Sequence, residues 1–119
     1  FEKAYRTILG DRGITLSGGQ IQRISIARSL IKDSALYHFD DCFSSLDTDT
    51  EERLINNLKN RLKNKSVVIV SHRVSCIKHS DKIIVLENGK IIQQGTHKNL
   101  INMDGYYKEL YNKQNSEIT

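Results

Sequence analysis

Two stretches of the chain place apolar residues at the spacing of an amphipathic helix. The first begins at Ser17, and its apolar residues recur three or four positions apart, at Ile21, Ile24, Ala27, Leu30 and Ile31. The second covers residues 48–64, where one side carries Leu54, Ile55, Leu58 and Leu62. Thr48 and Glu51 have the spacing of a capping box, acids fill the first turn and bases crowd the last. The pattern predicts a helix in each stretch.

Short apolar runs predict the strands. Residues 35–40 (ALYHFD) are one candidate, and residues 66–71 (SVVIVS) form a β-branched run typical of a strand buried on both faces. Residues 82–95 read as two strands around Asn88-Gly89, a strong signal for a hairpin.

The two ends of the chain differ. Residues 1–16 are expected to be a loop-rich entry, punctuated by Gly10 and Gly13. Residues 96–115 are predicted to be helical and to pack onto the domain through Tyr106, Tyr107, Leu110 and Tyr111. Because apolar strands alternate with helices, we expect an α/β fold with parallel pairing. We find no repeats or linkers, so one domain is expected.

Composition agrees with a globular protein. Of the 119 residues, 38% are hydrophobic and 27% are charged, and no apolar run of about 20 residues that would span a bilayer occurs. The opening residues lack a basic start followed by an apolar core, so we expect no secretory leader in this stretch. The net charge of +4 comes from scattered bases mixed with acids, which argues against a nucleic-acid-binding stripe.

Three reactive side chains have ordinary structural explanations. Cys42 and Cys76 lack the spacing of metal ligands, so we expect reduced thiols, with Cys42 as a small packing residue. His38 lies inside an apolar strand, where a hydrogen-bonded core histidine is favoured over a ligand.

Residues 16–20 read LSGGQ, at the predicted start of the first helix. Ser17 is a good helix cap, and the two glycines after it leave backbone N–H groups uncovered. A helix N-terminus has partial positive charge and unsatisfied donors, so it favours an anion such as phosphate. On this ground alone, a simple cap is the favoured interpretation.

Acids and a histidine follow the ends of the predicted strands. Asp40 and Asp41 end the first strand and His72 follows the next, so all three are expected at the edge of the sheet where α/β proteins bind ligands. A carboxylate there suits Mg²⁺, which prefers hard oxygens. Taken singly, either Asp could cap a helix and the histidine could bond a loop carbonyl. Three such groups facing one Gly-rich helix start favour phosphate chemistry.

Four segments in order carry a resemblance to a known family: LSGGQIQRISIARSL, ALYHFDDCFSSLD, VVIVSHR and DKIIVLENGKIIQQGTH. Together they resemble the C-terminal half of an ABC transporter nucleotide-binding domain of the exporter type, over roughly residues 7–115. The resemblance implies that residues 1–119 are a partial nucleotide-binding domain. Its fold would be a P-loop NTPase-like parallel sheet with flanking helices, incomplete because the P-loop half is absent, plus a C-terminal β-hairpin and helical tail.

The resemblance implies a role for each residue of the signature. Ser17, Gly18, Gly19 and Gln20 would grip the γ-phosphate of ATP held by a second nucleotide-binding domain. The segment Gly10–Gly13 resembles the loop that exporters press against their transmembrane domain. The protein would therefore sit at the cytoplasmic face of a membrane, attached through that domain.

The resemblance also implies roles for the strand-end residues. Asp40 would be the Walker B acid that organises Mg²⁺, and Asp41 would occupy the place of the catalytic Glu. Asp47 would be the D-loop aspartate at the domain-dimer interface, and His72 would be the switch histidine that touches the γ-phosphate. ATP and Mg²⁺ are thus the expected substrate and cofactor.

The sequence departs from the family pattern in two places. No G-x-x-x-x-G-K-[ST] occurs, and Gly89-Lys90, the only Gly-Lys pair, lies in the predicted hairpin turn. The family's Asp-Glu is Asp40-Asp41 here, and the shorter side chain withdraws its carboxylate by roughly one bond. A misplacement of about 1 Å can cost on the order of 10²-fold in rate. Asp41 is therefore expected to be a weakened base or water-orienting group.

An intact signature beside a shortened acid is typical of heterodimeric exporters, in which one of the two ATP sites is degenerate. The resemblance therefore implies an ATP-hydrolysing motor domain that couples hydrolysis at a domain-dimer interface to transmembrane export, and we expect the chain to belong to a heterodimeric exporter. Two alternatives to this function remain open at this stage. One is a regulatory module that binds ATP and scarcely cleaves it, and the other is a soluble ABC ATPase of DNA maintenance or translation. The transported substrate is not encoded in these residues.

The missing P-loop generates a prediction. Without the backbone cradle and lysine for the phosphates, the purified 119-residue chain should show no ATPase activity, in an assay of phosphate release with Mg²⁺ and ATP. Measurable turnover by the chain alone would contradict it.

Overall fold

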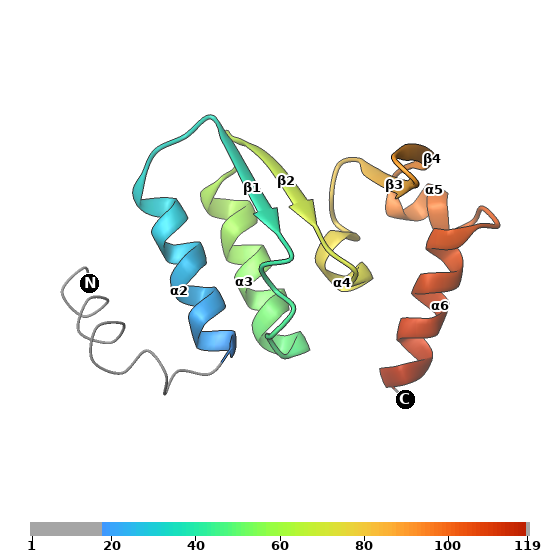
Figure 1. The fold of residues 1–119 in the computed structure, drawn as a ribbon, viewed down its shortest axis with the longest axis horizontal. Helices are drawn as coiled ribbons and strands as arrows, with labels where there is room; N and C mark the ends of the chain where they lie inside the picture. Colours follow the sequence, from blue (N-terminus) through green and yellow to red (C-terminus); the bar gives the residue numbers. More distant parts are fainter. Residues whose placement is uncertain (1–17, 119) are drawn as a thin grey trace. The chain divides into compact units, whose positions relative to one another are not determined.

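Residues 18–118 are described by a computed structural model (Figure 1). The chain divides after Val70 into two compact units, which are described one after the other. The segments Gly10–Gly13 and Ser17, to which the resemblance gives roles, lie outside the described residues.

The first unit alternates helices and strands. Its elements are helix α2 (Gly18–Ile31), strand β1 (Leu36–Asp40), helix α3 (Thr48–Arg61) and strand β2 (Ser66–Val70). The strands pair in parallel and in register, from Leu36 opposite Ser66 to Asp40 opposite Val70. Both helices run antiparallel to the strands (Figure 1). The predicted α/β class with parallel pairing is thereby confirmed.

One face of strand β1 is covered and the other is bare. Tyr37 and Phe39 are buried, whereas Leu36, His38 and Asp40 are exposed. The two buried rings stack with centroids 6.4 Å apart. The other buried apolar residues of this unit are Ile26, Phe43, Leu46, Ile55, Leu58 and Leu62. Within residues 18–118 the prediction of His38 as a core histidine fails, because alternation along the strand turns it to the bare face.

The predicted apolar face is confirmed for helix α3 and wrong for helix α2. In α3, the predicted side is confirmed, since Ile55, Leu58 and Leu62 are buried. In α2, the predicted side is wrong: Ile21 is 44% exposed and Ile31 is 71% exposed. The contact side of α2 runs instead through Gly19, Gln22 and Ile26, where small and polar groups approach a loop.

The start of α3 also differs from the prediction. Asp47 is the N-cap, and its Oδ1 accepts a hydrogen bond of 2.8 Å from the backbone N–H of Thr50. Thr48 is therefore the first helical residue and does not form the predicted capping box. Asp47 precedes Thr50 by three positions, which is the usual reach of a capping side chain.

Strand β2 is not buried on both faces within residues 18–118. Val68 and Val70 are each 47% exposed, and Val67 is 39% exposed. Only β1 pairs with it among the described residues, so one edge of the strand has no partner there. The prediction of full burial fails for this part of the chain, while the β-branched sequence remains typical of a buried strand.

The second unit is a hairpin with three helices. Its elements are α4 (Val74–Ile77), β3 (Ile83–Glu87), β4 (Lys90–Gly95), α5 (His97–Ile101) and α6 (Tyr106–Ile118). Strands β3 and β4 are antiparallel.

Asn88 and Gly89 connect the hairpin strands with φ of 51° and 76°, the left-handed conformations of a type I′ turn. The hairpin prediction is confirmed. The predicted helical tail is two helices, and the single turn α4 was not predicted because four residues show no periodicity.

The core of the second unit gathers around Tyr107. Val74, Ile83, Val85, Leu100 and Tyr107 form one buried cluster, with Leu110 and Tyr111 packed against it among others. Tyr106 is 54% exposed, so its predicted packing role is wrong, because it lies one position away from the buried side of α6.

His97 joins α5 to α6 in this core. Its Nδ1 lies 2.8 Å from the Tyr107 hydroxyl, and its ring meets the Tyr107 and Tyr111 rings edge-on. Burial, and then the charges of Lys78 and His79, lower the pKa of His97 below its usual 6.5. Burial raises the pKa of Tyr107 to about 12. The pair is therefore neutral at pH 7.

The neutral His97 generates a pH prediction. The unfolded chain binds a proton more readily than the folded chain, so the free energy of unfolding should decrease as the pH falls below 6.5. His97→Asn should reduce this dependence in urea unfolding measured between pH 5 and pH 8. His38→Asn, at an exposed position, should keep it. An unchanged dependence in His97→Asn would contradict the assignment.

Candidate functional site

The three predicted aspartates lie at the carboxyl edge of the first unit. Asp40 is the last residue of β1, Asp41 follows it, and Asp47 caps α3 after a short loop. All three are exposed. The carboxyl ends of parallel strands are where ligands bind in open α/β sheets, so the three acids lie at the end of the sheet where the sequence predicted them.

Asp41 has a strained backbone that is held by its neighbours. Its φ is 53°, a left-handed conformation that costs a residue with a side chain on the order of 1 kcal/mol or more. The N–H of Asp41 donates to the Val70 carbonyl at 2.8 Å, which extends the β1–β2 ladder by one bond. Its carbonyl accepts from the Ser44 hydroxyl at 3.4 Å. These contacts fix the main chain of Asp41, from which its carboxylate side chain extends.

Gln22 ties helix α2 to the loop between Asp41 and Asp47. Its Oε1 accepts from the Ser45 N–H at 2.8 Å, and its Nε2 donates to the Ser44 hydroxyl at 3.0 Å. The same Nε2 lies 3.4 Å from the Asp41 carbonyl. Sequence reasoning missed this residue, because no local pattern connects a helix side chain to a loop some 20 positions away.

The glycines of the signature have a packing role in this arrangement. A Cβ on Gly18 would lie 3.1 Å from the Ser45 hydroxyl oxygen, and one on Gly19 would lie 3.1 Å from the Ser45 carbonyl oxygen. Both distances are tighter than ordinary van der Waals contact, so a larger residue would require Ser45 to shift: its side chain at Gly18 and its main chain at Gly19. The structure thus brings Gly18 and Gly19 beside the loop that carries Asp41 and Asp47. Gln20, one position further along α2, is exposed.

Neighbouring groups shift the pKa values of two side chains in the loop after β1. Two hydrogen bonds from Thr50, and then the charges of Arg53 and Arg23, lower the pKa of Asp47 below its usual 3.8. Burial, and to a lesser degree the neighbouring aspartates, raises the pKa of the Cys42 thiol. Neither Cys42 nor Cys76 is in a disulfide. At pH 7, Asp47 is therefore a carboxylate and Cys42 a protonated thiol.

The donor set at this edge fits Mg²⁺ bound partly through water and phosphate. No group of three His, Cys, Asp or Glu residues that could hold a metal occurs within residues 18–118. Two adjacent exposed carboxylates, Asp40 and Asp41, are instead the kind of partial site at which Mg²⁺ keeps several waters and binds substrate oxygens.

His72 lies in the second unit, on the segment between β2 and α4. It is exposed, and its carbonyl oxygen accepts a 2.6 Å hydrogen bond from Gln114 Nε2. It follows Val70, the residue paired with Asp40, by two positions. That its imidazole reaches the edge bearing Asp40 stays a prediction.

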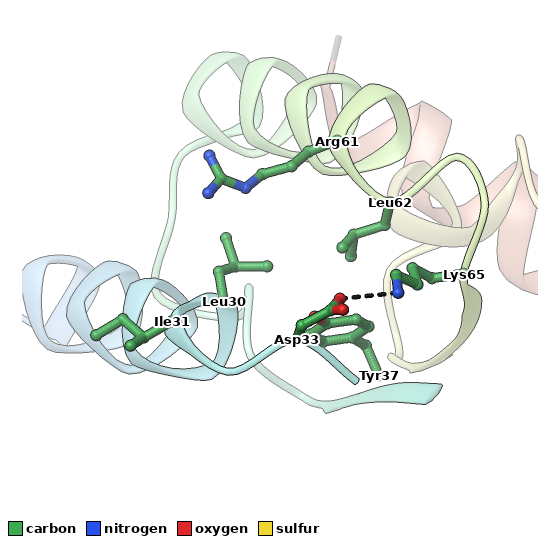
Figure 2. Close-up of a pocket in the computed structure, with 7 residues that line it drawn as sticks. All are labelled: Leu30, Ile31, Asp33, Tyr37, Arg61, Leu62 and Lys65. Carbon is green, nitrogen blue, oxygen red and sulfur yellow. Dashed lines mark ion pairs between the residues drawn. The ribbon is translucent and has the colours of Figure 1, made fainter. Parts of the chain in front are cut away.

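A pocket of about 180 Å³ lies at the opposite end of the first unit (Figure 2). Asp33 and Lys65 form an ion pair across it at 2.8 Å, and the Tyr37 hydroxyl donates to the Lys32 carbonyl beside it. Its other lining residues are Leu30, Ile31, Arg61 and Leu62. Because it lies at the amino end of the strands, it is separate from the aspartates.

The parallel strand pair, the glycine-led helix and the strand-end acids define the class of protein. The chain is homologous to ABC exporters, as the resemblance predicted. It is 44% identical over 110 residues to the ATP-dependent lipid A-core flippase of Legionella pneumophila (strain Paris), matching 92% of this chain and 19% of that protein. It is 43% identical over 115 residues to the mitochondrial iron-sulfur clusters transporter ABCB7 of Oryzias latipes, matching 96% of this chain and 15% of that protein.

A solved structure agrees with these relatives. The structure of a bacterial Atm1-family ABC exporter with ATP bound superposes with a TM-score of 0.81 and 39% identity, over 87% of this chain and 18% of that one. No protein-family model matches the chain. The chain spans about one-fifth of the length of the first relatives it matches, which is consistent with a C-terminal piece of a nucleotide-binding domain.

The Gln22 contacts generate a stability prediction. Gln22→Met keeps the side-chain length and removes the hydrogen bonds to Ser44 and Ser45, so the free energy of unfolding should fall by about 1 kcal/mol. Urea unfolding measures it, with Ser25→Met, at an exposed position of α2, as the control. Equal stability of Gln22→Met and wild type would show that the contacts contribute nothing.

Proposed function

We propose that the chain is the signature-bearing part of the ATP-hydrolysing domain of an ABC exporter, acting on ATP held between two such domains. The observation that carries the proposal is the packing of Gly18 and Gly19 against the loop from Asp41 to Asp47. This packing joins the helix start proposed to bind phosphate and the acids at the sheet edge into one connected surface. The surface is exposed and so open to a second domain.

Each residue has a defined task in the proposal. Backbone N–H groups at the start of α2, with Ser17 and Gln20, bind the γ-phosphate of ATP on the partner domain. Asp40 would hold Mg²⁺, which neutralises phosphate charge when bound. Asp41 orients the attacking water, Asp47 meets the partner domain, and His72 contacts the γ-phosphate. Such chemistry depends on positioning and charge stabilisation, which explains why the loop is held by so many contacts.

The bare face of the first sheet supports the view that the P-loop half of the domain is absent from these residues. Leu36, Val68 and Val70 are 57%, 47% and 47% exposed on that face. The first relatives are about five times as long as the chain, so they have ample length to supply the cover. We infer that the remaining part of the domain brings the P-loop and further strands to the free edge of β2, making 1–119 a partial nucleotide-binding domain.

The Asp at position 41 supports a degenerate ATP site in a heterodimeric exporter. Its carboxylate is one bond shorter than that of the glutamate implied by the resemblance, while Gly18 and Gly19 keep the signature intact. In this proposal, the signature serves the competent site of the partner chain. The alternative, a regulatory module that binds ATP and scarcely cleaves it, differs only in how fast the Asp41 site turns over. A non-transport ABC ATPase is disfavoured, because the relatives named above are transporters.

The partners follow from the same proposal. A second nucleotide-binding domain faces the carboxyl edge, and a transmembrane domain contacts the segment near Gly10–Gly13, which holds the domain at the cytoplasmic face of the membrane. Within residues 18–118, no helix has the length and apolar character needed to cross a bilayer. The names of the relatives mention a lipid and an iron-sulfur cluster, so they do not agree on a cargo.

The proposal is tested by lengthening the shortened acid. Asp41→Glu in the full-length protein should raise single-turnover ATP hydrolysis at this site by about tenfold or more, because the carboxylate regains roughly 1 Å of reach. Asp41→Asn has the same length as wild type without the charge and should lower it. No change in turnover for either variant would contradict the role of Asp41.

A further inference from the structure

The backbone around His72 is held by a side chain from the far end of the chain. Gln114, on helix α6, donates from Nε2 to the His72 carbonyl at 2.6 Å. Its Oε1 accepts from the N–H of Val74 at 2.9 Å. One amide therefore grips the main chain on both sides of Arg73, across 42 and 40 positions of sequence.

These two bonds tie the segment around Arg73 to helix α6. Helix α4 begins at Val74, and its N-cap residue Arg73 makes no side-chain capping bond. Gln114 thus supplies the acceptor that a capping side chain would otherwise provide. Local bonds also hold the segment: the N–H of Arg73 donates to the Ser71 hydroxyl at 3.0 Å, and the N–H of Cys76 donates to the Arg73 carbonyl at 3.1 Å. The His72 backbone is fixed while its side chain stays exposed, as a group that must meet a ligand requires.

Helix α6 is itself firmly attached to the second unit. Tyr107 is 2% exposed in the buried cluster, and its N–H donates to Gln93 Oε1 at 3.1 Å. Gln114 lies seven positions after Tyr107, two helical turns further along the same side. The amide therefore projects from a rigid support, so its hydrogen bonds define the path of the His72 main chain.

We propose that Gln114 is a positioning residue that sets the location of His72 for the hydrolysis of ATP. The inference depends on the proposed function, because it gives His72 a task at the γ-phosphate. Its physical basis is the bidentate contact, since loss of it frees the carbonyl of His72 and the first N–H of α4 together. A displacement of about 1 Å at a group that contacts the reacting phosphate is enough to slow the reaction on the order of 10²-fold.

A simple helix cap for α4 is the competing explanation, and two variants separate it from positioning. Gln114→Met keeps the length of the side chain and removes both hydrogen bonds. Gln114→Glu keeps an acceptor for Val74 and replaces the donor to the His72 carbonyl with a carboxylate oxygen that repels it. Gln94→Met, at an exposed position of β4, is a matched control for a glutamine replaced by methionine in the same unit.

The experiment measures kcat and KM for ATP in the full-length protein, with the thermal midpoint of each variant. We expect Gln114→Met and Gln114→Glu to lower kcat by about tenfold with KM for ATP within about twofold of wild type. Gln114→Glu should lower the thermal midpoint less than Gln114→Met does, because it retains the acceptor for the N–H of Val74. In a His72→Ala background, Gln114→Met should add less than about twofold, because residues that act through one another are not additive.

Three results would overturn the inference. Wild-type kcat in Gln114→Glu would show that the residue only caps α4. An equal loss from Gln114→Met with and without His72→Ala would show that it acts elsewhere. Wild-type kcat in His72→Ala would remove the proposed task of His72 and the inference with it. If His72→Ala lowers kcat while the Gln114 variants keep wild-type kcat, the inference alone is refuted.

Discussion

The close approach of helix α2 to the loop after strand β1 is the contact on which the site depends. Glycine at positions 18 and 19 allows the helix start to lie against Ser45, at distances where a Cβ would be 3.1 Å from the loop. That approach puts Gln22 within hydrogen-bonding distance of Ser44 and Ser45. The glycines therefore leave the backbone N–H groups at the helix start uncovered by side chains, and they allow the loop from Asp41 to Asp47 to lie beside them.

The site also shows how a single side-chain amide stabilises irregular backbone. Asp41 is left-handed and the segment after β2 has little regular structure, yet each is held by a glutamine that donates and accepts at the same time. Both glutamines extend from helices, which are stiff. Asp41 and His72, the two predicted catalytic residues, thus have exposed side chains on restrained main chains. This combination favours binding of a ligand without reordering of the main chain.

Local signals in the sequence predicted most of the fold. The Asn88-Gly89 turn, the parallel pair and the buried side of α3 were correct, because turn chemistry and periodicity act over a few residues. The buried side of α2 was wrong, because its contacts use a glycine and a glutamine where an apolar stripe was expected. The burial of β2 was wrong within the described residues, where only β1 pairs with it. Gln22 and Gln114 were missed because their partners are 23 and 42 positions away.

The central claim is that the start of α2 binds a nucleotide carried by another domain. A cryo-EM structure of the full-length protein with its partner domain, Mg²⁺ and a slowly hydrolysed ATP analogue tests it most directly. The account predicts the γ-phosphate about 3 Å from the backbone N–H of Gly19, with the P-loop of the opposite domain holding the same nucleotide. ATP found far from Gly18 and Gly19, or a helix start covered by its own domain, would contradict it.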